Sequence, residues 1–300
     1  MRANPFDARL AIAILVLAMT STHSAYSSDQ ISLVELVRQT VQNEIKPGNG
    51  NTKAMFVDHK AIPHGSQTKL LVETREGTAG LTVAINGKPL TQEQRSAEGE
   101  RVLGLAKNPE QLKKKQKGDK EDAEHTIRIM EALPDAFLYE PDGTAVGNAE
   151  LGRAGDRLVC LKFRPNPKYD PPTHVEQVLT GMQGELVIDA DQHRIAKIDG
   201  TLIKDVGFGW GILGRLDRGG HFLVQQAEAI PGEWEVTHMS LNFYGKELLF
   251  KSFSTTLDEV FTDFRPAPSN LTFAQGVELL KKQGAELAEN RERPGTGNRK

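Results

Sequence analysis

The sequence predicts a mainly β protein with helices, of the α+β class. Three observations support this prediction. Short runs of β-branched and aromatic residues alternate with polar residues over most of the chain, which is the pattern of half-buried strands. Turn residues separate these runs about every 8–12 residues, and one long polar segment rich in helix-forming residues interrupts them. Strands at this spacing form a sandwich, a barrel or one curved antiparallel sheet, and the spacing alone leaves these three architectures open.

The chain begins with the features of a secretory signal peptide. Arg2 and Arg9 precede an apolar run over residues 10–19, and small and polar residues follow. This order is typical of an export signal, and the run is shorter than the about 20 residues of a membrane-spanning helix. We therefore predict that residues 1–27 are removed, with a short buried helix as the alternative. The candidate cleavage sites follow Ser24, Ala25 and Ser27, of which Ser27 is favoured.

The single cysteine, Cys160, bears on the compartment and on the chemistry. Lipid attachment at a new amino terminus requires a cysteine there, so we expect a periplasmic or secreted protein that is not a lipoprotein. One cysteine also forms no intramolecular disulfide. Because Cys160 lies in the alternating run 157–163, we interpret it as a small buried thiol and not as a nucleophile.

Residues 28–284 are predicted to form one β domain. It opens with a helix, because residues 32–35 have the spacing of a capping box and apolar residues recur at helical intervals up to Ile45. Residues 285–300 have the composition of a disordered tail. Strands are predicted over residues 53–57, 68–74, 81–85, 137–139, 158–163, 184–189, 194–198, 221–225, 234–243, 248–253 and 260–264.

A helical insertion is predicted over about residues 91–133. Thr91 and Gln94 form a second capping box, and Asn108–Pro109 and Gly118 predict breaks, so the segment is two helices or one broken helix. Its polar middle, residues 111–124, is expected to stay in water, with Gly118 as a hinge. Its apolar ends are expected to dock on the sheet as a movable lid. These ends carry Val102, Leu103 and Leu105 on one side, and Ile127, Ile129, Met130 and Leu133 on the other.

Charge disfavours nucleic acid as a partner. The formal net charge is -3, the pI is about 6.3, and acidic and basic residues are interspersed. The exception is a lysine-rich run, for which a solvated helix face is the first interpretation and a transient contact with anionic lipid head groups is the alternative. This run contains Lys113, Lys114, Lys115 and Lys117.

Known catalytic and cofactor motifs are weak in this chain. Residues 209–214 match G-x-G-x-x-G, but a further strand is predicted after them where a dinucleotide site requires a helix. His59 and His64 lack the spacing of a metal site, so we predict neither metal nor cofactor. There is no G-x-S-x-G nucleophile elbow. The acidic pairs Asp189/Asp191 and Asp258/Glu259 are interpreted as solvated carboxylates at turns or strand edges.

One stretch resembles a known family. The hairpin 184–189 and 194–198, followed by long strands ending in 260–264, is similar to the carboxy-terminal part of the periplasmic lipoprotein-carrier superfamily, the LolA/LolB-like and outer-membrane lipoprotein-sorting proteins. The order of elements also resembles that of uncharacterised secreted bacterial proteins. The resemblance implies a curved antiparallel sheet or incomplete β-barrel, covered by helices around an apolar cavity for acyl chains. No functional residue of the carriers maps onto this sequence.

Together these observations predict a periplasmic, non-enzymatic carrier or sensor of a hydrophobic ligand such as a lipid or acyl chain. The first alternative is an envelope structural or interaction module with a filled core, and the second is a hydrolase. Each lining residue is also a candidate for ordinary core. The predicted lining comprises Phe208, Trp210, Ile212, Leu213, Phe222, Trp234 and Phe243.

Overall fold

A computed structural model describes residues 32–46, 52–208, 214–247 and 251–292. The predicted signal peptide, residues 1–27, lies outside these ranges, as do Trp210, Ile212 and Leu213. None of the helices within the described ranges combines the length and the hydropathy that crossing a membrane requires.

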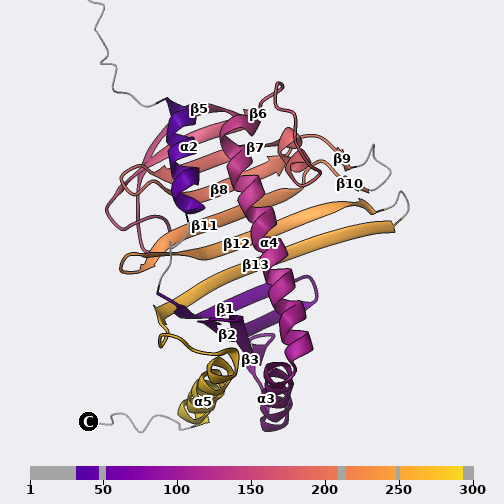
Figure 1. The fold of residues 1–300 in the computed structure, drawn as a ribbon, viewed down its shortest axis with the longest axis vertical. Coiled ribbons are helices and arrows are strands. Elements are labelled where there is room, and N and C mark those ends of the chain that lie inside the picture. Colours follow the sequence, from indigo (N-terminus) through magenta and orange to yellow (C-terminus); the bar gives the residue numbers. More distant parts are fainter. Residues whose placement is uncertain (1–31, 47–51, 209–213, 248–250, 293–300) are drawn as a thin grey trace, which may run out of the picture. The chain divides into compact units, whose positions relative to one another are not determined.

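The strands form one antiparallel sheet of 13 strands in the order β4-β3-β2-β1-β13-β12-β11-β8-β7-β6-β5, with the β9–β10 hairpin attached to β12 (Figure 1). The sheet is curved and open, because β4 and β5 end it without pairing to each other. The α+β prediction is therefore confirmed. The strands are β1 Ala54–Ile62, β2 Gly65–Thr74, β3 Gly77–Ile85, β4 Lys88–Pro89, β5 Phe137–Val146, β6 Arg157–Pro165, β7 Met182–Asp189, β8 Arg194–Leu202, β9 Val206–Phe208, β10 Gly214–Leu216, β11 His221–Ile230, β12 Glu233–Glu247 and β13 Lys251–Pro266.

Two helices cover one end of the sheet. α2 (Leu33–Glu44) and the last turns of α4 (Pro109–Ala136) pack on β5–β8 beside a 3-10 helix (Glu176–Gly181). We call this cluster the α2 core. Its buried side chains are Val37, Val41, Ala132, Leu133, Ala136, Phe137, Leu161, Phe163, Leu179, Met182, Leu186, Ile188, Ile195, Leu202 and Val206.

The other end of the sheet has its own core. α5 (Phe273–Glu292) and α3 (Gln92–Lys107) pack on β2 and β3 and bury Met55, Leu70, Val72, Ala79, Leu81, Val102, Phe273, Val277 and Leu280, which we call the α5 core. Gly276 lets α5 approach the strands closely, because a Cβ there would lie 2.7 Å from Cγ2 of Thr74. α5 corrects the predicted tail, since residues 285–292 continue a helix that the α5 core anchors. Residues 293–300 lie outside the described ranges.

The two cores lie on opposite faces of the sheet. Phe222 packs against the α2 core and pairs with Leu241, which pairs with Leu257. Paired residues share a face, and the face is regained every second residue, so Phe261 lies on this face too. Phe261 pairs with Asp58, whereas the neighbouring Val57 packs against the α5 core. The helices at each end therefore cover different faces.

The insertion folds as two helices, as one of the alternatives predicted. The Thr91 capping box is present in full, and Asn108 ends α3 and caps α4, with Pro109 at the first helical position. The predicted break at Gly118 is wrong, because α4 continues through it: the cost of about 1 kcal/mol for glycine is too small to stop a helix that is anchored at both ends.

Candidate ligand-binding site

α4 is held at its two ends. Near its start, Leu112 packs against the α5 core, and Gln116 Nε2 donates a 3.3 Å hydrogen bond to the carbonyl oxygen of Glu76 in the β2–β3 turn. Near its end, Leu133 and Ala136 are buried, and the Tyr139 hydroxyl donates a 2.7 Å bond to the Leu133 carbonyl oxygen. Between these ends α4 crosses in front of β11, β12 and β13 (Figure 1).

The middle of α4 does not pack on the sheet. Every residue from Asp119 to Arg128 is exposed, although a helix lying on a sheet buries one stripe of side chains. At 1.5 Å per residue this span is about 15 Å long. Ile127, predicted to dock with Ile129, Met130 and Leu133, is 40% exposed and belongs to this span, whereas the other three pack in or against the α2 core. The docking prediction for Ile127 is therefore wrong: the helix reaches the α2 core only from Ile129 onward.

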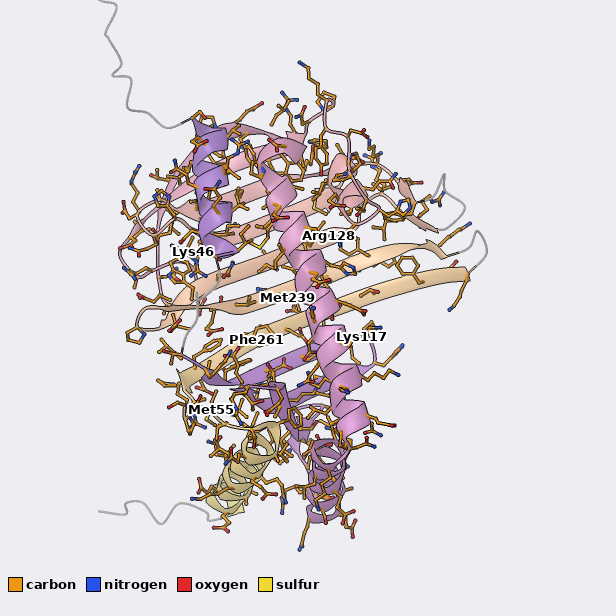
Figure 2. The ribbon with its side chains drawn as sticks, in the orientation of Figure 1. Lys46, Met55, Lys117, Arg128, Met239 and Phe261 are labelled. Atoms are coloured by element: carbon orange, nitrogen blue, oxygen red, sulfur yellow. The ribbon has the colours of Figure 1, made fainter. Side chains whose placement is uncertain are left out.

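Below this span the sheet presents a row of apolar side chains, of which only Phe222 and Phe243 pack against the α2 core within the described residues. The register places them on the face that adjoins the α2 core, and all are half-buried. We call this surface the α4 face; Figure 2 labels Met239 and Phe261 from it, together with Arg128 and Lys117 of α4. It comprises Phe222, Val224, Met239, Leu241, Phe243, Leu257 and Phe261. Glu259 lies on the same face, between Leu257 and Phe261 and opposite Met239, so one carboxylate interrupts the apolar surface. An apolar surface in contact with water is typical of a binding site.

Charged side chains border the α4 face at β1. Lys60 Nζ lies 2.7 Å from Glu259 Oε1. In the β1–β2 ladder, Lys69 lies opposite Asp58. Asp58 is 5% exposed, and its Oδ1 has no hydrogen-bond partner among the described groups. Burial, and then repulsion from Glu259, raises the pKa of Asp58. Glu259 is 8% exposed, so its interpretation as a solvated carboxylate is wrong. In the β1–β13 ladder it lies opposite Lys60, with which it forms the ion pair.

The structure divides the predicted lining. Phe208, Phe222 and Phe243 pack together against the α2 core. Trp234 does not join them: it packs against a third cluster containing Leu158 and lies under Arg194, whose guanidinium is 5.2 Å from the ring centroid. The prediction placed Trp234 with the other lining residues by residue type, and residue type does not show on which face of the sheet a side chain lies. Sequence reasoning missed five members of the α4 face, and β alternation is the signal that identifies them: Val224, Met239, Leu241, Leu257 and Phe261.

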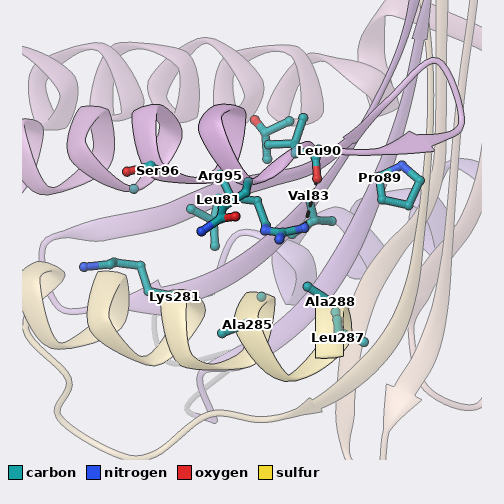
Figure 3. A pocket seen from close by; sticks show the side chains of 14 residues that line it. Leu81, Val83, Pro89, Leu90, Arg95, Ser96, Lys281, Ala285, Leu287 and Ala288 are labelled. Atoms are coloured by element: carbon teal, nitrogen blue, oxygen red, sulfur yellow. Dashed lines mark hydrogen bonds between the residues drawn. The ribbon is translucent and has the colours of Figure 1, made fainter. Parts of the chain in front are cut away.

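A separate cavity of about 270 Å³ lies between α3, α5 and β3 (Figure 3). Leu81, Val83, Leu90 and Leu287 contribute to its largely apolar lining. Two basic residues also line it: Arg95 Nη1 donates a 3.0 Å bond to the carbonyl oxygen of Leu90, and Lys281 Nζ lies 3.7 Å from Glu278. The sequence analysis did not predict this cavity because it did not predict α5.

Histidine–carboxylate pairs occur on the opposite face of the sheet. His221 Nε2 lies 2.8 Å from Asp199 Oδ1, and His238 Nε2 lies 2.8 Å from Asp258 Oδ1. The second ring nitrogen of His238 is 3.3 Å from Gln225 Oε1. Both nitrogens of His238 are thus engaged, so this ring is not placed to act as a general base.

Comparison of the chain with protein-family models, with curated protein sequences and with solved structures finds no significant match.

Proposed function

We propose that this protein is an exported, non-enzymatic carrier or sensor of one hydrophobic ligand with an acyl chain, bound on the α4 face beneath the exposed span of α4. The observation that carries the proposal is the coexistence of an uncovered apolar face and a helix that crosses it without packing on it. Covering the α4 face with a chain removes apolar surface of the sheet from water without requiring the core to rearrange.

A thin chain suits this location better than a folded partner does. α4 crosses in front of β11, β12 and β13, so a protein surface would have to displace α4 before it could cover these strands. Eight buried methylenes would contribute about 6 kcal/mol, from which the cost of immobilising the ligand is subtracted. Lys60 and Lys69 at the border offer ammonium donors for the head group of an amphiphile, but Glu259 and Asp58 lie beside them, so the border carries no net positive charge.

The predicted signal peptide and the resemblance to lipoprotein carriers support the proposed setting, a bacterial envelope. The lysine-rich run offers an additional contact with anionic lipid. Lys113 and Lys114 are exposed on α4, whereas Lys115 lies 2.6 Å from Asp119 and Lys117 lies 3.6 Å from Glu121. These intrahelical pairs favour the solvated-face interpretation for the last two lysines, so a membrane contact would depend on the first two.

Neighbouring residues of β11 provide a matched test. Val224 lies on the α4 face and Leu223 on the opposite face, and both are half-buried. Binding of a fluorescent long-chain fatty acid should be saturable in the wild type. It should weaken at least about tenfold in Val224→Glu, because a buried carboxylate disfavours the chain, and remain unchanged in Leu223→Glu. Circular dichroism verifies that both variants fold.

Two results would contradict the proposal. Loss of binding in Leu287→Glu, with binding retained in Val224→Glu, would place the ligand in the α3–α5 cavity. Absence of saturable binding, together with absence of any lipid in an organic extract analysed by mass spectrometry, would favour the interaction module.

A further inference from the structure

Three carboxylates converge where two connections of the sheet meet. Asp189 and Asp191 belong to the β7–β8 turn, and Asp156 ends the loop between β5 and β6. One oxygen from each lies within 4.8 Å of the others. Asp189 is 0% exposed, so its interpretation as a solvated carboxylate is wrong. The β5–β6 loop reaches this turn, where Gln192 Nε2 donates a 3.3 Å bond to Asp156 Oδ2.

The hydrogen bonds of Asp189 leave one oxygen without a partner. Its Oδ1 accepts bonds from the backbone N–H groups of Asp191, at 3.2 Å, and Gln192, at 3.0 Å. Its Oδ2 is equally buried and has no hydrogen-bond partner among the described residues. A buried carboxylate oxygen without a partner is costly, and a bound cation would remove that cost.

The nearest basic group already has another partner. Arg153 lies in the β5–β6 loop as well, but its guanidinium binds Glu228 on β11. Its Nε donates a 2.8 Å bond to Oε2 of Glu228, and its Nη2 donates a 2.8 Å bond to Oε1. Asp156 Oδ2 accepts a 3.3 Å bond from the side-chain amide of Gln192. The negative charge of the three carboxylates is therefore not balanced by a direct ion pair with this arginine.

We propose that Asp156, Asp189 and Asp191 bind a divalent cation of the calcium class, with Oδ2 of Asp189 as a ligand. The donor set is carboxylate oxygen throughout, which suits a hard cation and not zinc or copper. Calcium accepts an irregular set of ligands completed by water, whereas magnesium requires near-octahedral geometry. Asp156 is half-buried and Asp191 exposed, so water reaches the site from one side.

The cation would join two connections distant in sequence. The β5–β6 loop already lies on β11 and β12: the Gly152 N–H donates a 2.8 Å bond to the Gln226 carbonyl oxygen, and the Thr237 hydroxyl donates a 2.8 Å bond to the Glu150 carbonyl oxygen. A cation would attach the end of this loop to the β7–β8 turn. Calcium should therefore raise the stability of the folded chain by binding it in preference to the unfolded chain.

The test is calorimetric titration of the chelator-treated protein with Ca²⁺ and with Mg²⁺, together with thermal unfolding in each ion. We expect one Ca²⁺ per chain, weaker Mg²⁺ binding, and a higher unfolding temperature with Ca²⁺. Asp189→Asn and Asp191→Asn should each weaken Ca²⁺ binding at least about tenfold, in line with the effects of altered ligand shells. Asp170→Asn, at an exposed carboxylate elsewhere, is the matched control.

Asp189→Asn also gives a result that does not depend on titration. In chelator this variant should be at least as stable as the wild type, because it removes a buried charge, and it should gain no stability from Ca²⁺. Absence of Ca²⁺ binding by the folded wild type up to about 10 mM, beyond the weakest range of calcium-binding modules, would overturn the proposal. Equal Ca²⁺ affinity in the wild type and the Asp191→Asn variant would also overturn it.

Discussion

Replacing Gly118 by alanine tests whether α4 is a continuous bridge across the sheet. Gly118 has helical neighbours on both sides, and a Cβ built there meets no atom within 4 Å. The added methyl group therefore causes no clash, and the substitution removes the backbone freedom of glycine in the unfolded chain. We expect Gly118→Ala to stabilise the protein by about 0.5–1 kcal/mol. For a domain of this size, 1 kcal/mol raises the unfolding temperature by about 2–4 °C.

Gly104→Ala in α3 is the matched control, because a Cβ at Gly104 also meets nothing within 4 Å. The measurement is thermal and urea unfolding followed by circular dichroism. Similar stabilisation by both substitutions supports a continuous α4 that unfolds with the domain. Stabilisation by Gly104→Ala alone would refute the reasoning, since residue 118 would then not be helical, or α4 would open before the domain unfolds.

Three further predictions concern stability. Burial, followed by the charge of Glu73, raises the pKa of Glu235 from 4.5 to about 7. The folded protein therefore binds one more proton than the unfolded chain in this range, and its stability falls as pH rises from about 4.5 to about 7. Glu235→Gln should flatten this fall in urea unfolding measured at different pH values. Glu44 accepts a 3.0 Å bond from Arg194 Nε, and both side chains are largely buried, so Glu44→Ala should cost about 3–5 kcal/mol, and a loss below about 1 kcal/mol would show that the pair is solvated. Leu161 is 0% exposed, so Leu161→Ala should cost about 2–5 kcal/mol by the same assay, unless the α2 core collapses around the cavity.

The sequence predicted those elements whose signals are local. Alternation identified strands, and the Thr91 capping box placed the start of α3. α5 also had a local signal, since Phe273, Val277 and Leu280 recur at helical spacing and form part of the α5 core. The polar composition that follows Gly284 outweighed that signal in the sequence analysis. A buried anchor at the start of a helix thus allows it to continue into a segment that would not form a helix alone.

The candidate sites depend on information that is not local. Val224 and Leu223 differ in their proposed roles only through the face on which each lies, and that face is defined by pairing with β8 and β12. Asp156 and Asp189 meet only because β6 and β7 are neighbours and the β5–β6 loop folds back over their ends. Residue type and spacing show neither which strands pair nor which connections meet. The sequence therefore predicted that Trp234 lines the same site as Phe222, and that the carboxylate of Asp189 is solvated.

The way in which α4 is attached argues against a lid that swings open. Its last turns bury Ala132, Leu133 and Ala136 in the α2 core, and burial of Leu133 alone contributes about 1.5–3 kcal/mol. Detaching that end would also remove the carbonyl of Leu133 from the Tyr139 hydroxyl. The exposed span, in contrast, makes no such contacts, and the α4 face below it is already in contact with water. A ligand can therefore enter from the sides of the bridge while both ends stay docked, so ligand affinity need not depend on breaking either core.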